Sequence, residues 1–377
     1  MSDTELREYA PDEIINEVQL SLVDGVGSLM TKRLLDRFGS AESVLKGSMS
    51  ELEEVQGIGS ITARAIVESR DCQAALEIIH RCKDAGIDLV CMNDIRYPER
   101  LRTIHDPPPL LYVRGKIEPA DAFAIAVVGT RGCSYYGRRM TTKLVNGLVA
   151  AGFTIVSGLA RGVDGAAHEA ALTSRGRTLA VLGSGLLNIY PPEHIKLADR
   201  IVTQGAVMSE FPLDASGSKG NFPRRNRIVS GLSLGVLVTE SPLKSGSLIT
   251  ARLAMEQDRD VFAVPGPIDS DNSRGCHRLI RDGAVLVESI DDIIEVLSPL
   301  MTPVQHPAHE VEVHVPREIN LNDRESAVLG CIGMTPMPVD ALIEATKLAT
   351  HQVIAVLSIL EMRGLIVRTG GNTVRRV

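Results

Sequence analysis

The stretch that decides the fold spans residues 219–250 and reads KGNFPRRNRIVSGLSLGVLVTESPLKSGSLIT. Its centre, residues 234–238, is a short apolar run typical of a buried strand in a parallel sheet. The segment before it, residues 219–227, carries one lysine, three arginines and Phe222 without any acidic residue, and we interpret it as an exposed basic loop. The turn after it, residues 245–247, precedes a helical run and offers N–H groups and hydroxyls to an anion. Phosphate binding is therefore expected on both sides of the strand.

The chain around this stretch alternates short apolar runs with helical segments from Phe123 onward. This alternation is typical of a doubly wound α/β sheet, so we expect an extended Rossmann-like domain. The expected strands are residues 110–113, 124–128, 154–156, 178–182, 207–209, 234–238, 261–264 and 284–287. In such sheets ligands bind beyond the carboxyl ends of the strands. Glycine, serine and arginine dominate these ends, which indicates a rim that binds phosphate.

Two nucleotide-binding motifs are missing from this rim. The glycines of the first turn stand at 129, 132 and 137 and do not spell GxGxxG, and the second strand ends in Ser157-Gly158 rather than in an acidic residue. The P-loop pattern GxxxxGK[ST] is missing as well. The rim also lacks paired carboxylates and a nucleophile beside a base, so we expect no catalytic residue, no cofactor and no metal.

Arg131 follows the first strand of this sheet, where it has two interpretations. A salt bridge to Asp164 or Glu240 would make it structural. Arg138 and Arg139 lie one helical step beyond it, which favours contact with a phosphate.

Four other residues near the rim also have a structural interpretation. His168 lies in a helical run and is expected to be a packed or capping residue rather than a base. Glu240 ends the buried strand and is expected to orient Arg227 or a backbone turn. Tyr135 and Tyr136 either stack on bases or pack at a helix start, and the sequence favours neither.

The amino-terminal segment contains two similar units. Residues 22–27 and 55–59 each carry a Gly-hydrophobic-Gly turn followed by a helical run, a pattern typical of a helix–hairpin–helix pair. In DNA-binding proteins of this type the turn holds a phosphate. Few basic residues follow the turns here, so a packing module without a ligand is an equal alternative.

The carboxyl-terminal segment predicts a winged helix. Residues 299–317 are a proline-punctuated linker. Three helices are then expected, running from Asn322 to Ile332, from Pro338 onward and from Thr350 to Met362, before a hairpin at residues 365–376. The third helix has few basic side chains, whereas Arg368, Arg375 and Arg376 cluster on the wing. DNA contact and protein contact both remain open for this domain.

Several motifs of the central region resemble those of the DNA-processing protein A family. The matching residues are 128–131 (VGTR), 157–164 (SGLARGVD) with 167–168 (AH), 190–191 (YP), 209–210 (SE), 222–228 (FPRRNRI), 245–251 (SGSLITA) and 262–266 (FAVPG). They extend over almost the whole central region.

The resemblance implies a protein that binds single-stranded DNA in a basic pocket, forms a homodimer, and loads a RecA-type recombinase during natural transformation. Carried onto this chain, the pocket uses Arg131, Lys219 and Phe222, with residues 225–227 and 245–247 beside them. The full predicted nucleic-acid-binding set is Gly129, Thr130, Arg131, Ser157, Gly158, Arg161, Lys219, Phe222, Arg224, Arg225, Asn226, Arg227, Lys244, Ser245, Gly246 and Ser247. The family is not known for nucleotide hydrolysis.

The far edge of the sheet is the predicted dimer interface. An apolar helix face at residues 276–280 leads into the short strand 284–287, and such an edge is normally covered. A family dimer would cover it with His277, Ile280 and Leu286. The alternative is that the helix at residues 290–297 covers the edge within one chain.

Composition sets further bounds on the chain. It has 377 residues and a net charge of −7, so nucleic-acid binding requires a local basic patch. The start of the chain lacks a signal-peptide pattern and no run approaches ~18 apolar residues, so we expect a cytoplasmic protein that is not bound to a membrane. The six scattered cysteines predict neither disulfides nor a zinc site. The predicted domains are residues 1–90, 91–298 and 318–377, with the linker at 299–317.

Two alternative functions remain at this stage. The central region also resembles nucleotide-processing Rossmann enzymes related to the phosphoribohydrolases, but these carry a PGGxGT loop and a following glutamate, whereas residues 265–269 here read PGPID. The other alternative is a scaffold whose end domains bind partner proteins.

Overall fold

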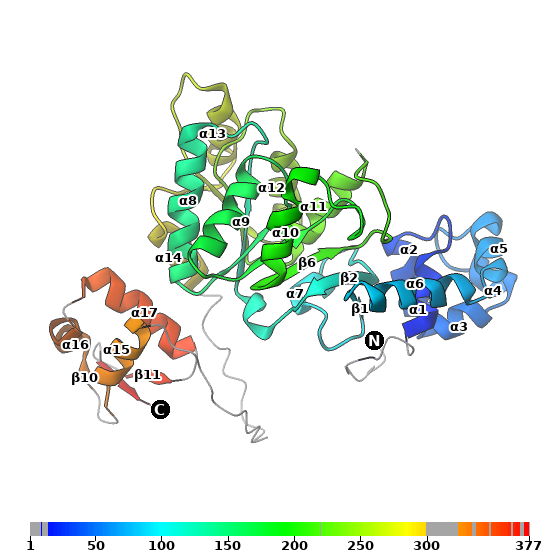
Figure 1. Ribbon diagram of the computed structural model, residues 1–377, viewed down its shortest axis with the longest axis horizontal. Coiled ribbons are helices and arrows are strands. Elements are labelled where there is room, and N and C mark those ends of the chain that lie inside the picture. Colours follow the sequence, from blue (N-terminus) through cyan, green and yellow to red (C-terminus); the bar gives the residue numbers. More distant parts are fainter. Residues whose placement is uncertain are drawn as a thin grey trace. The chain divides into compact units, whose positions relative to one another are not determined.

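The computed structural model describes residues 9, 14–218, 220–298, 323–333, 337–346, 348–362, 365–369 and 373–376. The chain divides into two compact units, Met1–Asp292 and Ile293–Val377 (Figure 1). The first unit contains a helical amino-terminal part and a nine-stranded sheet. The second unit contains three helices and a three-stranded sheet within its described residues.

The amino-terminal helices are α1 (Ile15–Ser21), α2 (Ser28–Phe38), α3 (Ala41–Lys46), α4 (Met49–Glu53), α5 (Ser60–Glu68) and α6 (Gln73–Asp84). The expected pair of helix–hairpin–helix units is present. Gly25 and Gly57 adopt φ values of +83° and +95°, which favour glycine, and α2 and α5 begin directly after these turns. In the second turn, the Gln56 carbonyl accepts a hydrogen bond from Arg33 at 2.8 Å. This hydrogen bond therefore links the two helix–hairpin–helix units.

The large sheet confirms the predicted α/β class. Its strands are β1 (Asp88–Cys91), β2 (Leu110–Gly115), β3 (Ala124–Val128), β4 (Thr154–Ser157), β5 (Thr178–Val181), β6 (Gly205–Ser209), β7 (Gly235–Val238), β8 (Asp260–Ala263) and β9 (Val285–Leu286). Their spatial order is β1-β2-β6-β5-β4-β3-β7-β8-β9. Strands β3 to β9 pair in parallel, whereas β1 and β2 add an antiparallel edge. The sequence did not predict β1.

The strand order reverses at β3, and this reversal places the functional site. From β3 the chain builds outward to β4, β5 and β6 on one side, and later to β7, β8 and β9 on the other. The crossovers beside β3 therefore leave in opposite directions, and a crevice opens at the carboxyl ends of β3 and its neighbours.

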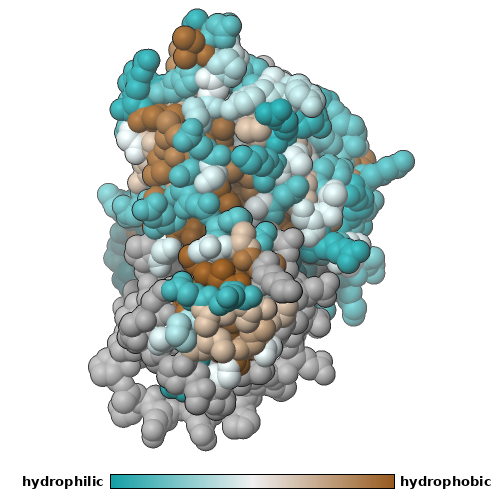
Figure 2. Space-filling model, turned by 90° about the vertical axis from the view of Figure 1, so that its left-hand side faces the viewer, coloured by the Kyte–Doolittle hydropathy of each residue, from teal (hydrophilic) through white to brown (hydrophobic). Residues whose placement is uncertain are grey.

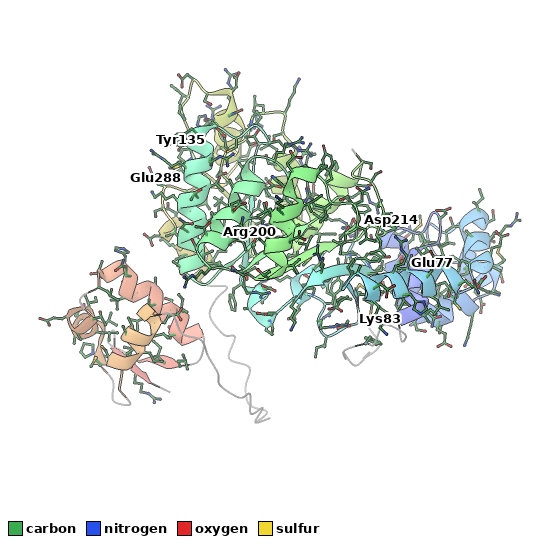
Figure 3. All side chains as sticks on the ribbon, in the orientation of Figure 1. Glu77, Lys83, Tyr135, Arg200, Asp214 and Glu288 are labelled. Atoms are coloured by element: carbon green, nitrogen blue, oxygen red, sulfur yellow. The ribbon has the colours of Figure 1, made fainter. Side chains whose placement is uncertain are left out.

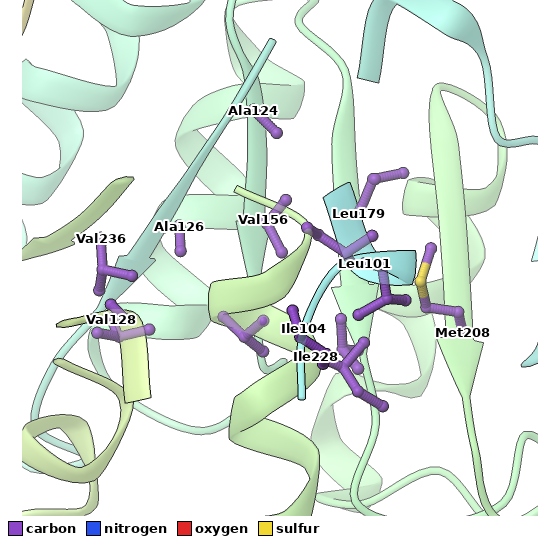
Figure 4. Packing of buried hydrophobic residues seen from close by; sticks show 14 of the residues in the cluster. Leu101, Ile104, Ala124, Ala126, Val128, Val156, Leu179, Met208, Ile228 and Val236 are labelled. Atoms are coloured by element: carbon purple, nitrogen blue, oxygen red, sulfur yellow. The ribbon is translucent and has the colours of Figure 1, made fainter. Parts of the chain in front are cut away.

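Helices cover both faces of the sheet. Side chains of α9 (Val163–Thr173) and α10 (Ile195–Val202) belong to one apolar cluster, and α8 (Tyr135–Ala150) packs beside α9. The opposite face carries α7 (Glu99–Arg102), α11 (Asn221–Gly231), α12 (Gly246–Glu256) and α13 (Arg274–Arg281). On that face Ala124, Ala126 and Val128 of β3 lie in the cluster that also holds Val236 and Ile228 (Figure 4). Helix α14 (Asp291–Leu297) follows β9.

The second unit has the predicted order of a winged helix. It consists of α15 (Asp323–Cys331), β10 (Met337–Pro338), α16 (Val339–Thr346), α17 (Thr350–Met362), β11 (Ile366–Thr369) and β12 (Thr373–Arg376). Strands β11 and β12 form the expected antiparallel hairpin, and β10 pairs with β12. The predicted linker at 299–317 and the glycines at 370–371 lie outside the described residues.

No single helix among the described residues is long and apolar enough to cross a membrane. Helices α16 and α17 meet the length and hydropathy requirement only as a pair bent by 113°. All six cysteines are described and unpaired, and burial raises the pKa of Cys276 to about 12.

His168 is a packing residue, as the sequence predicts. It is fully buried on α9, and its Nδ1 lies 2.7 Å from the Thr178 hydroxyl at the start of β5. That hydroxyl donates to the Ile155 carbonyl, so Nδ1 carries a proton and donates to the hydroxyl. Burial is the main cause that lowers the pKa of His168 from 6.5 to about 3.

This burial predicts a pH dependence of stability. Between pH 6.5 and 3 the unfolded chain binds a proton at His168 that the folded chain rejects, so the free energy of unfolding must fall as the pH falls. We expect a loss of about 3 kcal/mol between pH 7 and pH 4 from this residue. Urea unfolding of His168→Gln should show a shallower pH dependence, because the amide does not titrate. The control is His80→Gln at an exposed position, and equal pH profiles for the two variants would contradict the prediction.

Candidate nucleic-acid interface

A cavity of about 420 Å³ lies at the carboxyl ends of β3, β4 and β7, where the strand order reverses. Four segments surround it: the turn after β3, the turn after β4, the start of α11 and the start of α12. The lining residues include Gly129, Thr130, Arg131, Gly158, Ala160, Asp164, Phe222, Arg225, Asn226, Lys244, Ser245, Gly246 and Ser247. The structure therefore brings together most of the predicted rim residues.

Two glycines allow the walls of this cavity to approach each other. A Cβ on Gly129 would lie 2.7 Å from the Glu240 carbonyl oxygen, which accepts a 2.7 Å hydrogen bond from the Thr130 N–H. A Cβ on Gly158 would lie 2.2 Å from Nη1 of Arg225. Any larger residue would displace backbone or a buried guanidinium, so these positions require glycine.

The basic segment at residues 219–227 is not the exposed loop expected from the sequence. Residues from Asn221 onward form α11, and Arg225 is only 4% exposed. Its Nη1 donates hydrogen bonds to the Gly158 carbonyl, directly after β4, and to the Val181 carbonyl, at the end of β5. Burial lowers the pKa of Arg225 to about 10, so the side chain still carries its charge at neutral pH. Arg225 is thus a cation fixed at the wall of the cavity.

Arg227 points away from the cavity, so its predicted place among free phosphate-binding residues is wrong. Its Nε lies 2.9 Å from Asp106, and its Nη2 lies 2.6 Å from Glu210. The same Nη2 donates to the Ser28 hydroxyl at 2.8 Å, at the first residue of α2. Because carboxylates already hold this guanidinium, it is a structural residue.

Glu240 does not orient Arg227, and of the two predicted alternatives it orients a backbone turn. The Ser134 N–H donates to one carboxylate oxygen at 2.8 Å, and the Ser134 hydroxyl donates to the other at 2.6 Å. Ser134 is the N-cap of α8, so Glu240 places negative charge at the positive end of that helix.

Phe222 lines the cavity and contacts both a cation and a second aromatic ring. The Arg131 guanidinium lies over the Phe222 ring at 5.0 Å from its centroid. The Tyr190 ring lies on Phe222 as well, with centroids 5.7 Å apart and planes tilted by 49°. In the described part of the chain no ion pair joins Arg131 to Asp164 or Glu240, so its guanidinium is available to a phosphate. Tyr190 is not among the predicted site residues, although Tyr190-Pro191 is one of the motifs.

The turn before α12 supplies the opposite wall. Ser245 is the N-cap of this helix, and its hydroxyl accepts a hydrogen bond from the Ser247 N–H at 3.3 Å. Lys244 is exposed beside it and forms no salt bridge among the described residues. The positive end of an eleven-residue helix and a free lysine therefore face the same space as Arg131.

The remaining predicted residues lie in different places. Arg161 forms an ion pair with Glu193 beside the cavity. Arg224 is exposed and lies over the ring of Phe211. Ser157 is buried, and its hydroxyl donates to the Val127 carbonyl at 2.6 Å, so its predicted contact with a ligand is wrong. Lys219 lies outside the described residues.

The two tyrosines at the start of α8 also differ from each other. Tyr136 donates its hydroxyl to the Pro265 carbonyl at 2.6 Å and is a packing residue. Tyr135 is 83% exposed and does not line the cavity. Neither tyrosine contributes to this cavity wall.

The cavity combines features that suit a strand of nucleic acid. Fixed and free cations, together with a helix N-terminus, can hold phosphates, and the Phe222 ring offers a face to a base. Among the described residues no three His, Cys, Asp or Glu side chains are grouped so that they could hold a metal ion.

Comparisons with known protein families cover all three parts of the chain. The family described as DNA recombination-mediator protein A matches residues 88–298. The DprA winged helix domain matches residues 314–372, and the SAM-like helix-hairpin-helix tandem matches residues 18–70.

Individual relatives agree with these matches. Protein Smf of Synechocystis is 34% identical over 388 residues, covering 94% of this chain and 97% of the relative. Protein Smf of Escherichia coli is 44% identical over 280 residues, covering 74% and 75% of the two chains. The crystal structure of DNA processing protein A (DprA) from Streptococcus pneumoniae has a TM-score of 0.67 at 34% identity and covers 76% of this chain and 98% of its own.

A second solved structure is DNA processing protein A from Helicobacter pylori, which is described by its single-stranded DNA binding mode. Its TM-score is 0.51 at 32% identity, and it covers 56% of this chain and 96% of its own. Sequence motifs, domain matches and full-length relatives agree, and the chain therefore belongs to the DNA recombination-mediator protein A family.

Proposed function

We propose that this protein binds single-stranded DNA in the 420 Å³ cavity, protects it, and loads a RecA-type recombinase onto it during natural transformation. The observation that carries the proposal is Phe222, an aromatic ring that lines a cationic cavity beside Arg131 and Tyr190. Family membership supports the mediator role, because relatives are DNA processing proteins and one is described by its single-stranded DNA binding mode. We expect the protein to carry out this function in the cytoplasm.

The geometry favours single strands over duplexes for a physical reason. A stacking residue needs an unpaired base whose face is accessible, and a duplex hides these faces between neighbouring base pairs. The other cavity groups are backbone N–H groups, small hydroxyls and cations, which recognise phosphates rather than a base sequence. Binding should therefore depend on strandedness and not on sequence.

We also infer that binding proceeds without turnover. The described cavity lining contains one carboxylate, Asp164, and burial raises its pKa while an Ala160 N–H donates to it at 3.3 Å. It has no second carboxylate as a partner among the lining residues, and no serine there is paired with a histidine. The nucleotide-processing alternative lacks its phosphate loop at residues 265–269.

The experiment that tests this function is a competition assay by fluorescence anisotropy. A labelled oligothymidylate is bound to the full-length protein and displaced with an unlabelled single strand or a blunt duplex of equal length. We expect the single strand to compete far better at physiological salt, and all oligonucleotides and added ATP with Mg²⁺ to stay intact. Equal competition by the duplex, or nucleotide cleavage, would contradict the proposal.

Two cavity variants should weaken binding by different mechanisms. Arg131→Ala removes a phosphate contact, so the slope of log K against log salt should fall by about 0.7. Phe222→Ala removes a stacking face and should cost about 1–3 kcal/mol of binding free energy. Tyr135→Ala and Lys143→Ala are matched controls, because both residues are exposed and lie outside the cavity lining. The proposal fails if the folded cavity variants bind as tightly as the controls.

We further propose that the protein forms a homodimer through the β9 edge of the sheet. Among the described residues strand β9 pairs with β8 alone, and its Leu286 is 43% exposed. Ile280 of α13 is half-buried against the core beside it, and His277 lies 3.0 Å from the Gly266 carbonyl. Figure 2, which views the side of α8 and α14, shows apolar residues that reach the surface among hydrophilic ones. A second copy would cover this edge.

Ile280→Glu combined with Leu286→Glu should give a monomer by light scattering, because two carboxylates would be buried in the interface. The wild type should have twice the monomer mass at micromolar concentration. Ile61→Glu, on an exposed residue of α5, is the control and should stay dimeric. A monomeric wild type would refute the proposed interface.

A further inference from the structure

A second groove of about 290 Å³ opens between the amino-terminal ends of α8, α9 and α10, beyond the Phe222 and Tyr190 rings. Its lining residues are Arg138, Gly162, Gly165, Ala166, Glu169, Glu193, His194, Lys196, Leu197 and Arg200. Figure 1 shows the three helices that border it side by side, and Figure 3 labels Arg200 on α10. None of these residues belongs to the cavity that contains Arg131.

A small hollow adjoins the first cavity and shares lining residues with it. This hollow is lined by Arg131, Gly158, Ala160 and Phe222, which also line the first cavity. It is completed by Arg161, Tyr190 and Pro191. Gly162 directly follows Arg161, Glu193 lies two residues after Pro191, and both belong to the second groove. The ion pair of Arg161 with Glu193 links the hollow to the second groove. The second groove therefore lies next to this hollow.

The second groove has an excess of positive charge. Its two carboxylates are already paired, since Glu169 accepts two hydrogen bonds from Arg200 at 2.9 and 2.8 Å and Glu193 pairs with Arg161. Arg138 and Lys196 are both exposed and form no salt bridge in the described part of the chain. Two uncompensated cations therefore remain, on a chain whose net charge is −7.

The start of α9 forms one wall of this groove. Gly162 is the N-cap of this helix, and Gly165 and Ala166 lie in its first turn, where their N–H groups already donate to the carbonyls of Ala160 and Gly162. His194 packs closely on this turn, because a Cβ on Gly165 would lie 2.9 Å from its Cε1. The Nδ1 of His194 lies 2.8 Å from the Leu159 carbonyl and donates to it, which leaves Nε2 on the other side of the ring.

We propose that the second groove is a subsite for the backbone of the same DNA strand that fills the first cavity. The strand leaves the cavity past Phe222, places a base against Tyr190, which is 37% exposed, and lays its next phosphates against Arg138 and Lys196. Cations along a groove, together with aromatic faces, are the usual means of holding a single strand without reading its sequence. The inference rests on the proposed binding of single-stranded DNA in the first cavity.

The test compares two lengths of oligothymidylate, about 4 and about 16 nucleotides, because only the longer one reaches from the cavity into the groove. Arg138→Ala combined with Lys196→Ala is measured against Lys143→Ala combined with Lys83→Ala, which removes the same charge. Lys143 lies on the same helix as Arg138, and Lys83 lies on α6, away from Arg200 (Figure 3). Circular dichroism checks that each variant is folded.

The groove variant should bind the short oligonucleotide like its control and bind the long one roughly tenfold more weakly, with a salt slope lower by about 1.4 for two lost phosphate contacts. Equal affinity and equal salt slope of both double variants for the long oligonucleotide would overturn the subsite and leave the first cavity intact as a binding site. A wild type that binds neither length would instead overturn the proposed function, and the subsite with it.

Discussion

The buried guanidinium of Arg225 is the interaction on which the site depends. It links α11 to the carboxyl ends of β4 and β5 through the carbonyls of Gly158 and Val181. A buried charge is costly unless hydrogen bonds and an opposite charge compensate it, and Asp164 provides the opposite charge here. The same guanidinium requires a glycine at position 158, because any Cβ there would occupy its space. Phe222 lies three residues before Arg225 on the same face of α11, so this anchor also positions the stacking ring.

Arg227 fixes α11 from its other side. Its guanidinium reaches Asp106, Glu210 and Ser28, which lie after α7, after β6 and at the start of α2. One side chain therefore connects the helical amino-terminal part, the sheet and the helix that carries Phe222. The guanidinium groups of Arg225 and Arg227 bind protein groups, and Arg225 lines the cavity together with its neighbours Phe222 and Asn226. A rigid helix between two anchors keeps a small aromatic platform in one orientation, which reduces the entropy lost on binding a flexible strand.

Much of this arrangement could be predicted from the sequence, because the strands are apolar runs bounded by glycine and serine. The failures have identifiable causes. Strand β1 (Asp88–Cys91) is a four-residue run whose partner β2 lies in a separate segment, so no local pattern reveals it. The basic residues around Phe222 predicted an exposed loop, whereas a helix begins at Asn221. Pro223 does not prevent this helix, because proline is tolerated in the first turn, where its missing N–H has no partner. The burial of Arg227 depends on Asp106, 121 residues away, and long-range pairing of this kind leaves no local signal.

The contrast between paired and unpaired cations explains how a chain of net charge −7 can present a binding path for a polyanion. Arg161, Arg200 and Arg227 are neutralised by carboxylates, and they organise the walls. Other cations have no salt bridge among the described residues: Arg131 and Lys244 line the first cavity, and Arg138 and Lys196 line the second groove. The cavity and the groove thereby each present unpaired cations to phosphate. Counterions leave the DNA only where a cation contacts a phosphate. Affinity should therefore depend on how many of these four cations the strand reaches.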